Sequence, residues 1–469
     1  MHSRAGKVPV RTPSLAYYYA AILFLLAVAF VLRLFGVWSD IPFTYDVGIL
    51  QHWGHTLFYN GLAAFYSDGA FSDYPPLYMY VLWAIGAVRD AFGFAPHYIS
   101  PRSNLVTFMP AILFDLAAGA LVYFSCLYFG KDEGRTTLPN AFGVPFWLTA
   151  VYLWNPAVIL NSSIWGQVDA VHTFMMALAL FSLAKNLARP SIVPYLLFGL
   201  AVMVKPQSLI VAPIFLCSAL HYVWALRGGD AWRINHKQLV TAGTLLLFAV
   251  ATFALMFAVS APFAWTGTFP FVDFYYVVSQ YIETFGQRPH PTINAYNFHF
   301  MVGGNWGSIT PFLAFVGYSS IVAVTLTVFW LLLGKFRAST LFFSGALLFM
   351  TTFTFSVRMN ERYGFPAMLF LVLAYVALRY EAPAEKALHR GLLWIFTLFS
   401  LAHFANVADI LLIGMRGGQR LFTVGVEGTV NVWLVGQPVD EAAALVAAVN
   451  MALVAAMFVM AGRLRKVSP

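Results

Sequence analysis

The chain has 469 residues, of which 60% are hydrophobic and only 10% are charged, whereas about 25% charged residues is usual for a soluble domain. These proportions exclude a soluble protein, and the recurrence of apolar stretches able to cross a ~30 Å hydrocarbon layer excludes a protein with one anchor. The formal charge of +8 is spread over short segments between these stretches, so it indicates membrane topology rather than binding to nucleic acid.

Hydropathy and loop breakers predict an all-α polytopic protein with twelve membrane spans. The two cysteines, Cys126 and Cys217, fall inside apolar stretches, which excludes a disulfide framework or a cysteine-rich metal site. We expect a single integral-membrane domain over residues 1–469, with a core module at about 16–235 and more variable helices at about 236–461. The predicted spans lie near 16–37, 103–128, 141–160, 168–184, 191–204, 207–226, 239–262, 311–334, 339–357, 364–379, 392–413 and 441–461.

The distribution of basic residues predicts that both termini are cytoplasmic. With the basic N-terminal segment inside, 18 of the 27 lysines and arginines fall in cytoplasmic segments, each of which holds at least two of them. Counting the apolar stretch 76–88 as a span would invert this pattern, so we predict an interfacial or re-entrant helix there. The first outer loop then covers about 38–102, and the long outer loops place any chemistry on the outer face.

Three of the five aspartates in the first outer loop are candidate site residues. Asp46 lies just beyond the first span, and His52 and Trp53 follow it, with Asp46 and Trp53 two helical turns apart on one face. A helix-capping aspartate followed by interfacial aromatics would explain the same pattern. Asp68 and Asp73 precede the interfacial helix, and three carboxylates in one loop suggest a general base or a cation site.

The later outer segments add polar and basic candidates, each with a structural alternative. Gln167 and Asp169 interrupt an apolar stretch, so they face a polar cavity or form a turn; Lys205 is a site residue or a snorkelling interface lysine. Arginines on the outer side oppose the positive-inside tendency and suggest phosphate binding, although an Arg/Glu pair capping a helix is the simpler explanation. The phosphate-binding candidates are Lys205, Arg288, Arg358 and Arg362, and the candidates for stacking on sugars are Trp53, Tyr74 and Trp165.

In this order the motifs resemble the GT-C superfamily of glycosyltransferases, closest to the endoplasmic reticulum glucosyltransferases that use dolichyl phosphate glucose and to their bacterial relatives. The resemblance covers most of residues 16–380 and departs where Asn360 replaces a histidine. The matching positions are Asp46, His52 and Trp53; the run Asp73, Tyr74, Pro75, Pro76 and Leu77; Asn155-Pro156 through Asp169; Lys205 and Gln207; and Asn360, Glu361 and Arg362.

The resemblance implies transfer of one sugar, with inversion, from a polyprenyl-phosphate donor to a lipid-linked or cell-envelope glycan. The acceptor hydroxyl must lose a proton, so Asp46 is the predicted base, with Asp73 and Asp169 as runners-up and His52 and Gln167 as secondary candidates. No Asp-x-Asp pair occurs, so we expect no metal or other cofactor. We expect membrane lipid as a partner, no obligatory protein partner, and a bacterial inner membrane with the site facing outward. A protein O-mannosyltransferase and a lipid or sugar transporter are the alternatives.

Overall fold

The computed structural model describes residues 14–38, 44–66, 72, 74–96, 98–131, 139–227, 234–264, 279, 289–415 and 440–467. Within these ranges the chain is almost entirely helical, which confirms the predicted all-α membrane fold. The helices are α1 (Leu15–Trp38), α2 (Thr44–Asn60), α3 (Pro76–Ala91), α4 (Pro101–Phe129), α5 (Val144–Leu153), α6 (Pro156–Ile159), α7 (Asp169–Lys185), α8 (Val193–Val204), α9 (Ala212–Trp224), α10 (His236–Ser260), α12 (Phe298–Met301), α13 (Pro311–Gly334), α14 (Ala338–Phe355), α15 (Pro366–Glu381), α16 (Lys386–Met415) and α17 (Glu441–Lys466).

Eight segments of the described chain are long and apolar enough to cross a membrane, so the twelve predicted spans are not confirmed. The predicted spans at 141–160, 168–184, 191–204 and 364–379 correspond to α5, α7, α8 and α15, which have 10, 17, 12 and 16 residues. At about 1.5 Å per residue these helices extend only about 15–26 Å. Two of these helices end close to a proline. Lys205, before Pro206, is extended at φ −153° and ψ 125°, as a residue before proline prefers, and Asn155 caps a new helix that starts at Pro156.

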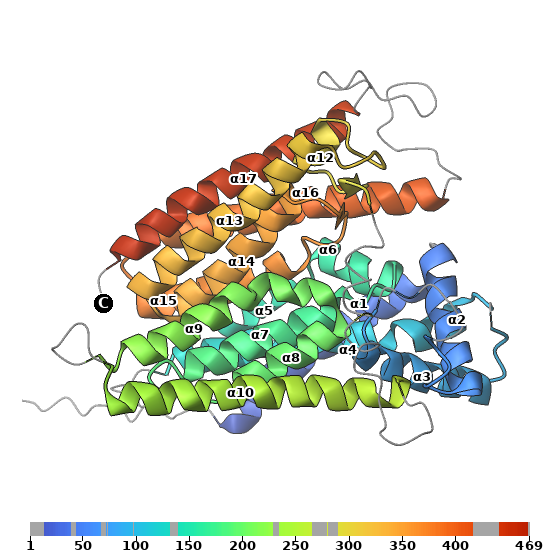
Figure 1. Cartoon of the computed structure of the whole chain (residues 1–469). Helices are drawn as coiled ribbons and strands as arrows, with labels where there is room; N and C mark the ends of the chain where they lie inside the picture. The colour runs from blue at the N-terminus through green and yellow to red at the C-terminus, as the bar shows by residue number, and fades with distance from the viewer. Residues whose placement is uncertain are drawn as a thin grey trace, which may run out of the picture.

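The helices form two layers that lie against each other (Figure 1). Helices α1 to α10 make one layer, and α12 to α17 make the other, with α14 packed against both α15 and α7. Two short strands, β1 (Thr292–Ile293) and β2 (Met359–Asn360), pair in parallel beside the second layer. This pairing fixes the turn that leads from β2 to α15.

Helices α2 and α3 form a closely packed pair at one end of the molecule (Figure 1). A Cβ atom on Gly86 would lie 2.1 Å from the carbonyl oxygen of Gly54, so only glycine permits this approach of the two backbones. The helix predicted at 76–88 is therefore present as α3, and it packs on α2.

A buried ion pair joins α1, α4 and α5. Arg33 and Asp115 are both fully buried, with Nη2 of Arg33 3.2 Å from Oδ2 of Asp115. Nη1 of Arg33 also donates to the carbonyl oxygen of Leu153, the last residue of α5, at 3.1 Å. Charges at this depth are costly unless they are paired, so this contact holds three helices in register.

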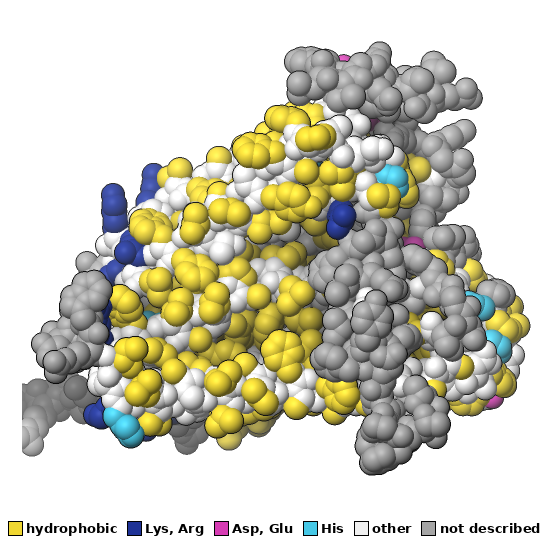
Figure 2. All heavy atoms as spheres, in the orientation of Figure 1, with side chains coloured by type: hydrophobic (Ala, Val, Ile, Leu, Met, Phe, Trp, Pro, Cys, Tyr) yellow, Lys and Arg dark blue, Asp and Glu magenta, His cyan; other side chains and the backbone are white. Residues whose placement is uncertain are grey.

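The visible face of the molecule is dominated by hydrophobic side chains, as expected for a surface in contact with lipid (Figure 2). Lysine and arginine side chains gather at the end of the bundle where the C-terminus lies. Helices α2 and α3 lie at the opposite end, so the basic end and the candidate site described below are on different sides of the bundle.

Candidate functional site

Asp46 lies in the first turn of α2 and is the most accessible member of a charged cluster. Its Oδ2 atom accepts hydrogen bonds from Nε1 of Trp165 at 3.1 Å and from Nε2 of Gln167 at 2.8 Å. Nη1 of Arg362 lies 3.6 Å from the same oxygen, and the Asp46 side chain is 22% exposed. Asp46 therefore receives two neutral donors and one cation on a single oxygen.

The donors Trp165 and Gln167 are positioned by an irregular segment between α6 and α7. Residues Leu160–Ile164 form a π-helical turn, a feature often found at functional sites. Gly166 follows at φ +73°, and a Cβ atom there would lie 2.0 Å from the ring of Phe108. Only glycine fits this bend, and the bend directs both flanking side chains toward Asp46.

Asp169, the first residue of α7, is the buried centre of the cluster. Its side chain is 1% exposed and forms a short ion pair with Nζ of Lys205. His172, one turn later, places Nε2 3.6 Å from the same carboxylate oxygen, and Nε of Arg362 lies 3.8 Å from the other. The Lys205 ammonium also lies over the rings of Tyr74 at 5.7 Å and Tyr363 at 5.4 Å, so this lysine is held on several sides.

Arg362 enters the cluster from the other layer, through the turn between β2 and α15. Nη1 of Arg362 donates to Oε1 of Glu361 at 2.8 Å, and its guanidinium lies 5.6 Å from the ring centre of Trp165. Burial lowers the pKa of Arg362, but the neighbouring carboxylates, first that of Glu361, raise it well above its ordinary value. Arg362 is therefore a permanent cation that links the two layers.

The cluster compensates its own positive charge. The cluster holds two cations, Lys205 and Arg362, and three carboxylates. Both cations therefore already have carboxylate partners within the cluster. The side chains of Asp169 and Glu361 are 1% and 4% exposed, against 22% for Asp46. The accessible group is thus a carboxylate, which accepts hydrogen bonds from hydroxyl groups or binds an ammonium group.

The three aromatic residues predicted to stack on sugars are buried rather than exposed. Trp53 is 5% exposed and Tyr74 8%, and their rings meet edge to face at 5.8 Å. Trp165 is 1% exposed and uses its N–H on Asp46. In this structure all three rings contact protein side chains, and their stacking on sugars stays a prediction.

Five of the predicted polar and charged site residues converge: Asp46, Gln167, Asp169, Lys205 and Arg362. His52 is exposed, next to the buried Trp53, and Arg358 is half-buried at φ +66°, donating its N–H to the carbonyl oxygen of Pro291 at 2.8 Å. Asp73 and Arg288 lie outside the described residues. The sequence reasoning missed His172, although its spacing of three residues from Asp169 on one helix would have suggested contact.

The chain matches one family model over residues 44–300, that of the GPI transamidase subunit PIG-U. The match covers more than half of the 469 residues and includes four of the five converging positions. No curated protein matches the chain at a significant level.

This match corrects the predictions that followed from the resemblance to GT-C glycosyltransferases. PIG-U is a different family, described as a subunit of a transamidase, and transamidation exchanges amide bonds rather than glycosidic bonds. The predicted hexosyltransferase activity with a polyprenyl-phosphate sugar donor is therefore wrong, and so are the alternatives of a protein O-mannosyltransferase and a transporter. The role of Asp46 as a base for sugar transfer depended on that activity.

Two further predictions change for the same reason. A family of complex subunits implies protein partners, so the prediction of no obligatory partner is wrong. The bacterial placement depended on the contradicted resemblance, whereas the integral-membrane placement agrees with the eight candidate spans. With more than half of its length matched, the chain belongs to the PIG-U family of GPI transamidase subunits.

Proposed function

We propose that the chain is a membrane subunit of a GPI-transamidase-type complex, and that the cluster around Asp46 binds the headgroup of the glycosylphosphatidylinositol substrate. The family match supports the complex, and the accessible carboxylate of Asp46 is the observation that carries the site. In this proposal the chain holds the lipid substrate, and amide exchange takes place on a partner subunit.

The chemistry of the cluster suits such a headgroup. A glycosylated inositol displays many hydroxyl groups, and a carboxylate accepts their hydrogen bonds strongly because it is charged. Arg362 and Gln167 fix the Asp46 carboxylate from one side, so it is preorganised before the ligand arrives. Where the outer face of a bundle meets the membrane surface, such a group is within reach of a lipid headgroup.

The sidedness is also part of this proposal. We infer that the cluster faces the non-cytoplasmic side and that both termini are cytoplasmic, since the basic residues gather at the end of the bundle away from α2 and α3. No metal or other cofactor is assigned to the cluster, because Lys205 and Arg362 provide its positive charge.

Replacing Asp46 by asparagine tests the binding role. Asparagine keeps the size and the acceptor oxygen but removes the charge, so affinity for glycosylphosphatidylinositol should fall roughly tenfold, about the difference between a charge-assisted and a neutral hydrogen bond. The measurement is titration of the purified full chain in mild detergent, read by native mass spectrometry.

The matched control is Asp90→Asn, which removes an exposed carboxylate from α3 outside the cluster. Its affinity should stay within about twofold of the wild type, and both variants should unfold at similar temperatures. Equal affinity in Asp46→Asn and the wild type would remove Asp46 from the site.

A further inference from the structure

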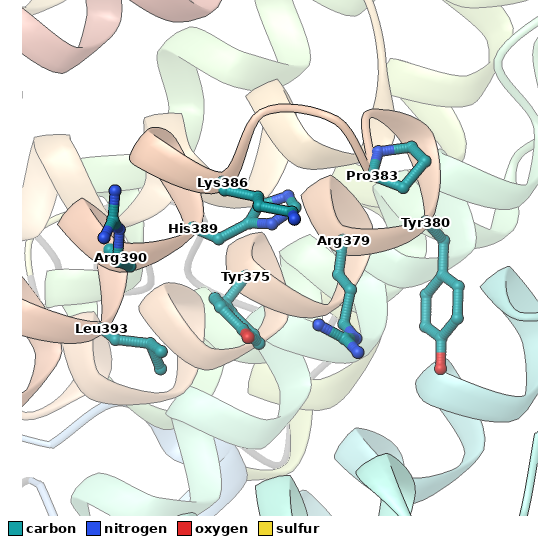
Figure 3. A pocket seen from close by; sticks show the side chains of 8 residues that line it. All are labelled: Tyr375, Arg379, Tyr380, Pro383, Lys386, His389, Arg390 and Leu393. Carbon is teal, nitrogen blue, oxygen red and sulfur yellow. The ribbon is translucent and has the colours of Figure 1, made fainter.

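A polar cavity lies between the end of α15 and the start of α16 (Figure 3). Its volume is about 630 Å³, within the usual size of a small-ligand pocket. It lies at the basic end of the bundle, away from the Asp46 cluster. The lining residues are Tyr375, Arg379, Tyr380, Pro383, Lys386, His389, Arg390 and Leu393.

The charge of this cavity is strongly one-sided. Arg379 comes from α15, and Lys386 and Arg390 come from successive turns of α16; none of the eight lining residues is acidic. The nearby Glu381 is engaged elsewhere, because its carboxylate accepts the backbone N–H groups of Ala338 and Ser339 at 3.0 and 3.2 Å, where α14 begins. Three cations therefore face the cavity without a carboxylate among them.

His389 forms an ordered part of the wall. It is 7% exposed, its ring meets that of Tyr375 at 5.9 Å and 70°, and Nε2 lies 3.4 Å from the carbonyl oxygen of Leu378. These contacts hold His389 in place, so the cavity has a defined wall beside the three cations.

The cavity lies at one end of a candidate membrane span. Lys386 is the first residue of the candidate span Lys386–Ile413, so in a membrane the cations would lie near the lipid headgroups, at the boundary between hydrocarbon and water. Below them on α16, exposed apolar side chains continue from Leu393, 38% exposed, through Trp394, 66% exposed, to Leu401, 60% exposed. An anionic lipid bound here can lay its acyl chains along this apolar face. A soluble anion has no such chains and gains nothing from the face.

We propose that this cavity binds the phosphate group of an anionic membrane lipid, with Arg379, Lys386 and Arg390 as the cationic contacts. Arginine forks and lysine ammonium groups both suit phosphate oxygens, and basic pockets between membrane helices at the cytoplasmic side are suited to acidic lipid headgroups. The assignment uses the sidedness proposed above but does not depend on the role proposed for Asp46.

The test is binding of dioctanoyl phosphatidylglycerol to the purified full chain in mild detergent. The wild type should bind it saturably and at least tenfold more tightly than dioctanoyl phosphatidylcholine, whose choline cation opposes the pocket. Lys386→Gln combined with Arg390→Gln should weaken phosphatidylglycerol binding about tenfold or more. Both side chains are exposed, so the fold should persist, and Arg390→Gln alone should give a smaller loss in the same direction.

The matched control is Lys237→Gln combined with Arg463→Gln, which also removes one exposed lysine and one exposed arginine, from α10 and α17. Its affinity should remain within about twofold of the wild type. If both double variants lose the same affinity for phosphatidylglycerol, the loss reflects the overall charge of the chain, and the proposed site is wrong. Competition by inorganic phosphate at the same concentration as phosphatidylglycerol would identify a soluble anion as the occupant and overturn the lipid assignment.

Discussion

Replacing Arg362 by glutamine is expected to lower the free energy of unfolding by roughly 3–5 kcal/mol, the usual cost of removing one partner from a buried ion pair. Arg362 contacts the carboxylates of Glu361, Asp46 and Asp169 at 2.8, 3.6 and 3.8 Å, and it is the cation that crosses between the two layers. Without it, Lys205 alone faces three carboxylates. Denaturant unfolding of the purified chain in detergent measures the loss.

Two companion variants define the cause. Arg362→Lys should recover only part of the stability, because a single ammonium cannot reproduce the spread of a guanidinium over several carboxylates. Arg102→Gln removes an exposed arginine from the first turn of α4 and should cost less than about 0.5 kcal/mol. A loss below about 1 kcal/mol in Arg362→Gln would mean that the cluster does not hold the layers together.

The buried Arg33–Asp115 pair gives the second large effect. Arg33→Met leaves the Asp115 carboxylate uncompensated at 0% exposure, so it should cost roughly 3–5 kcal/mol of unfolding free energy. Arg33→Met combined with Asp115→Leu removes both charges and should return to within about 2 kcal/mol of the wild type, since apolar replacement of a whole buried pair is often nearly neutral.

The double-mutant cycle separates pairing from packing. A coupling energy between Arg33 and Asp115 of several kcal/mol is expected, because Nε and Nη2 of Arg33 both donate to the Asp115 carboxylate. If the double variant is as unstable as Arg33→Met, the arginine acts through its hydrogen bond to the carbonyl of Leu153 and not through the charge of Asp115.

The sequence identified most of the cluster but not its internal pairing. Polar residues at the outer ends of apolar helices marked Asp46, Gln167, Asp169, Lys205 and Arg362, and these do meet. Their partners could not be predicted, since they come from segments up to about 300 residues apart. Arg362 was one of the residues predicted to bind phosphate, and the structure shows that it also contacts the carboxylates of Asp46, Asp169 and Glu361.

Hydropathy predicted twelve spans, which the eight candidate spans of the described residues do not confirm, and it did not reveal that Arg33 pairs with Asp115. A sliding window averages across the helix boundaries at Pro156 and Pro206, and it tolerates one charge such as Arg33 inside a long apolar stretch. Family assignment failed for a related reason. The resemblance was based on separate short motifs, of which the run Asp73 to Leu77 is five residues long, while the family match extends over residues 44–300, and such motifs do not outweigh a match of that length.

The most direct test of the central claim is complementation of cells that lack their own PIG-U subunit, with surface display of a GPI-anchored reporter as the measurement. The intact chain should restore display, Asp90→Asn should restore it equally, and Asp46→Asn should reduce it about tenfold at the same level of membrane-inserted protein. A chain that inserts into the membrane and assembles with the other subunits, yet leaves the reporter unprocessed, would contradict the account.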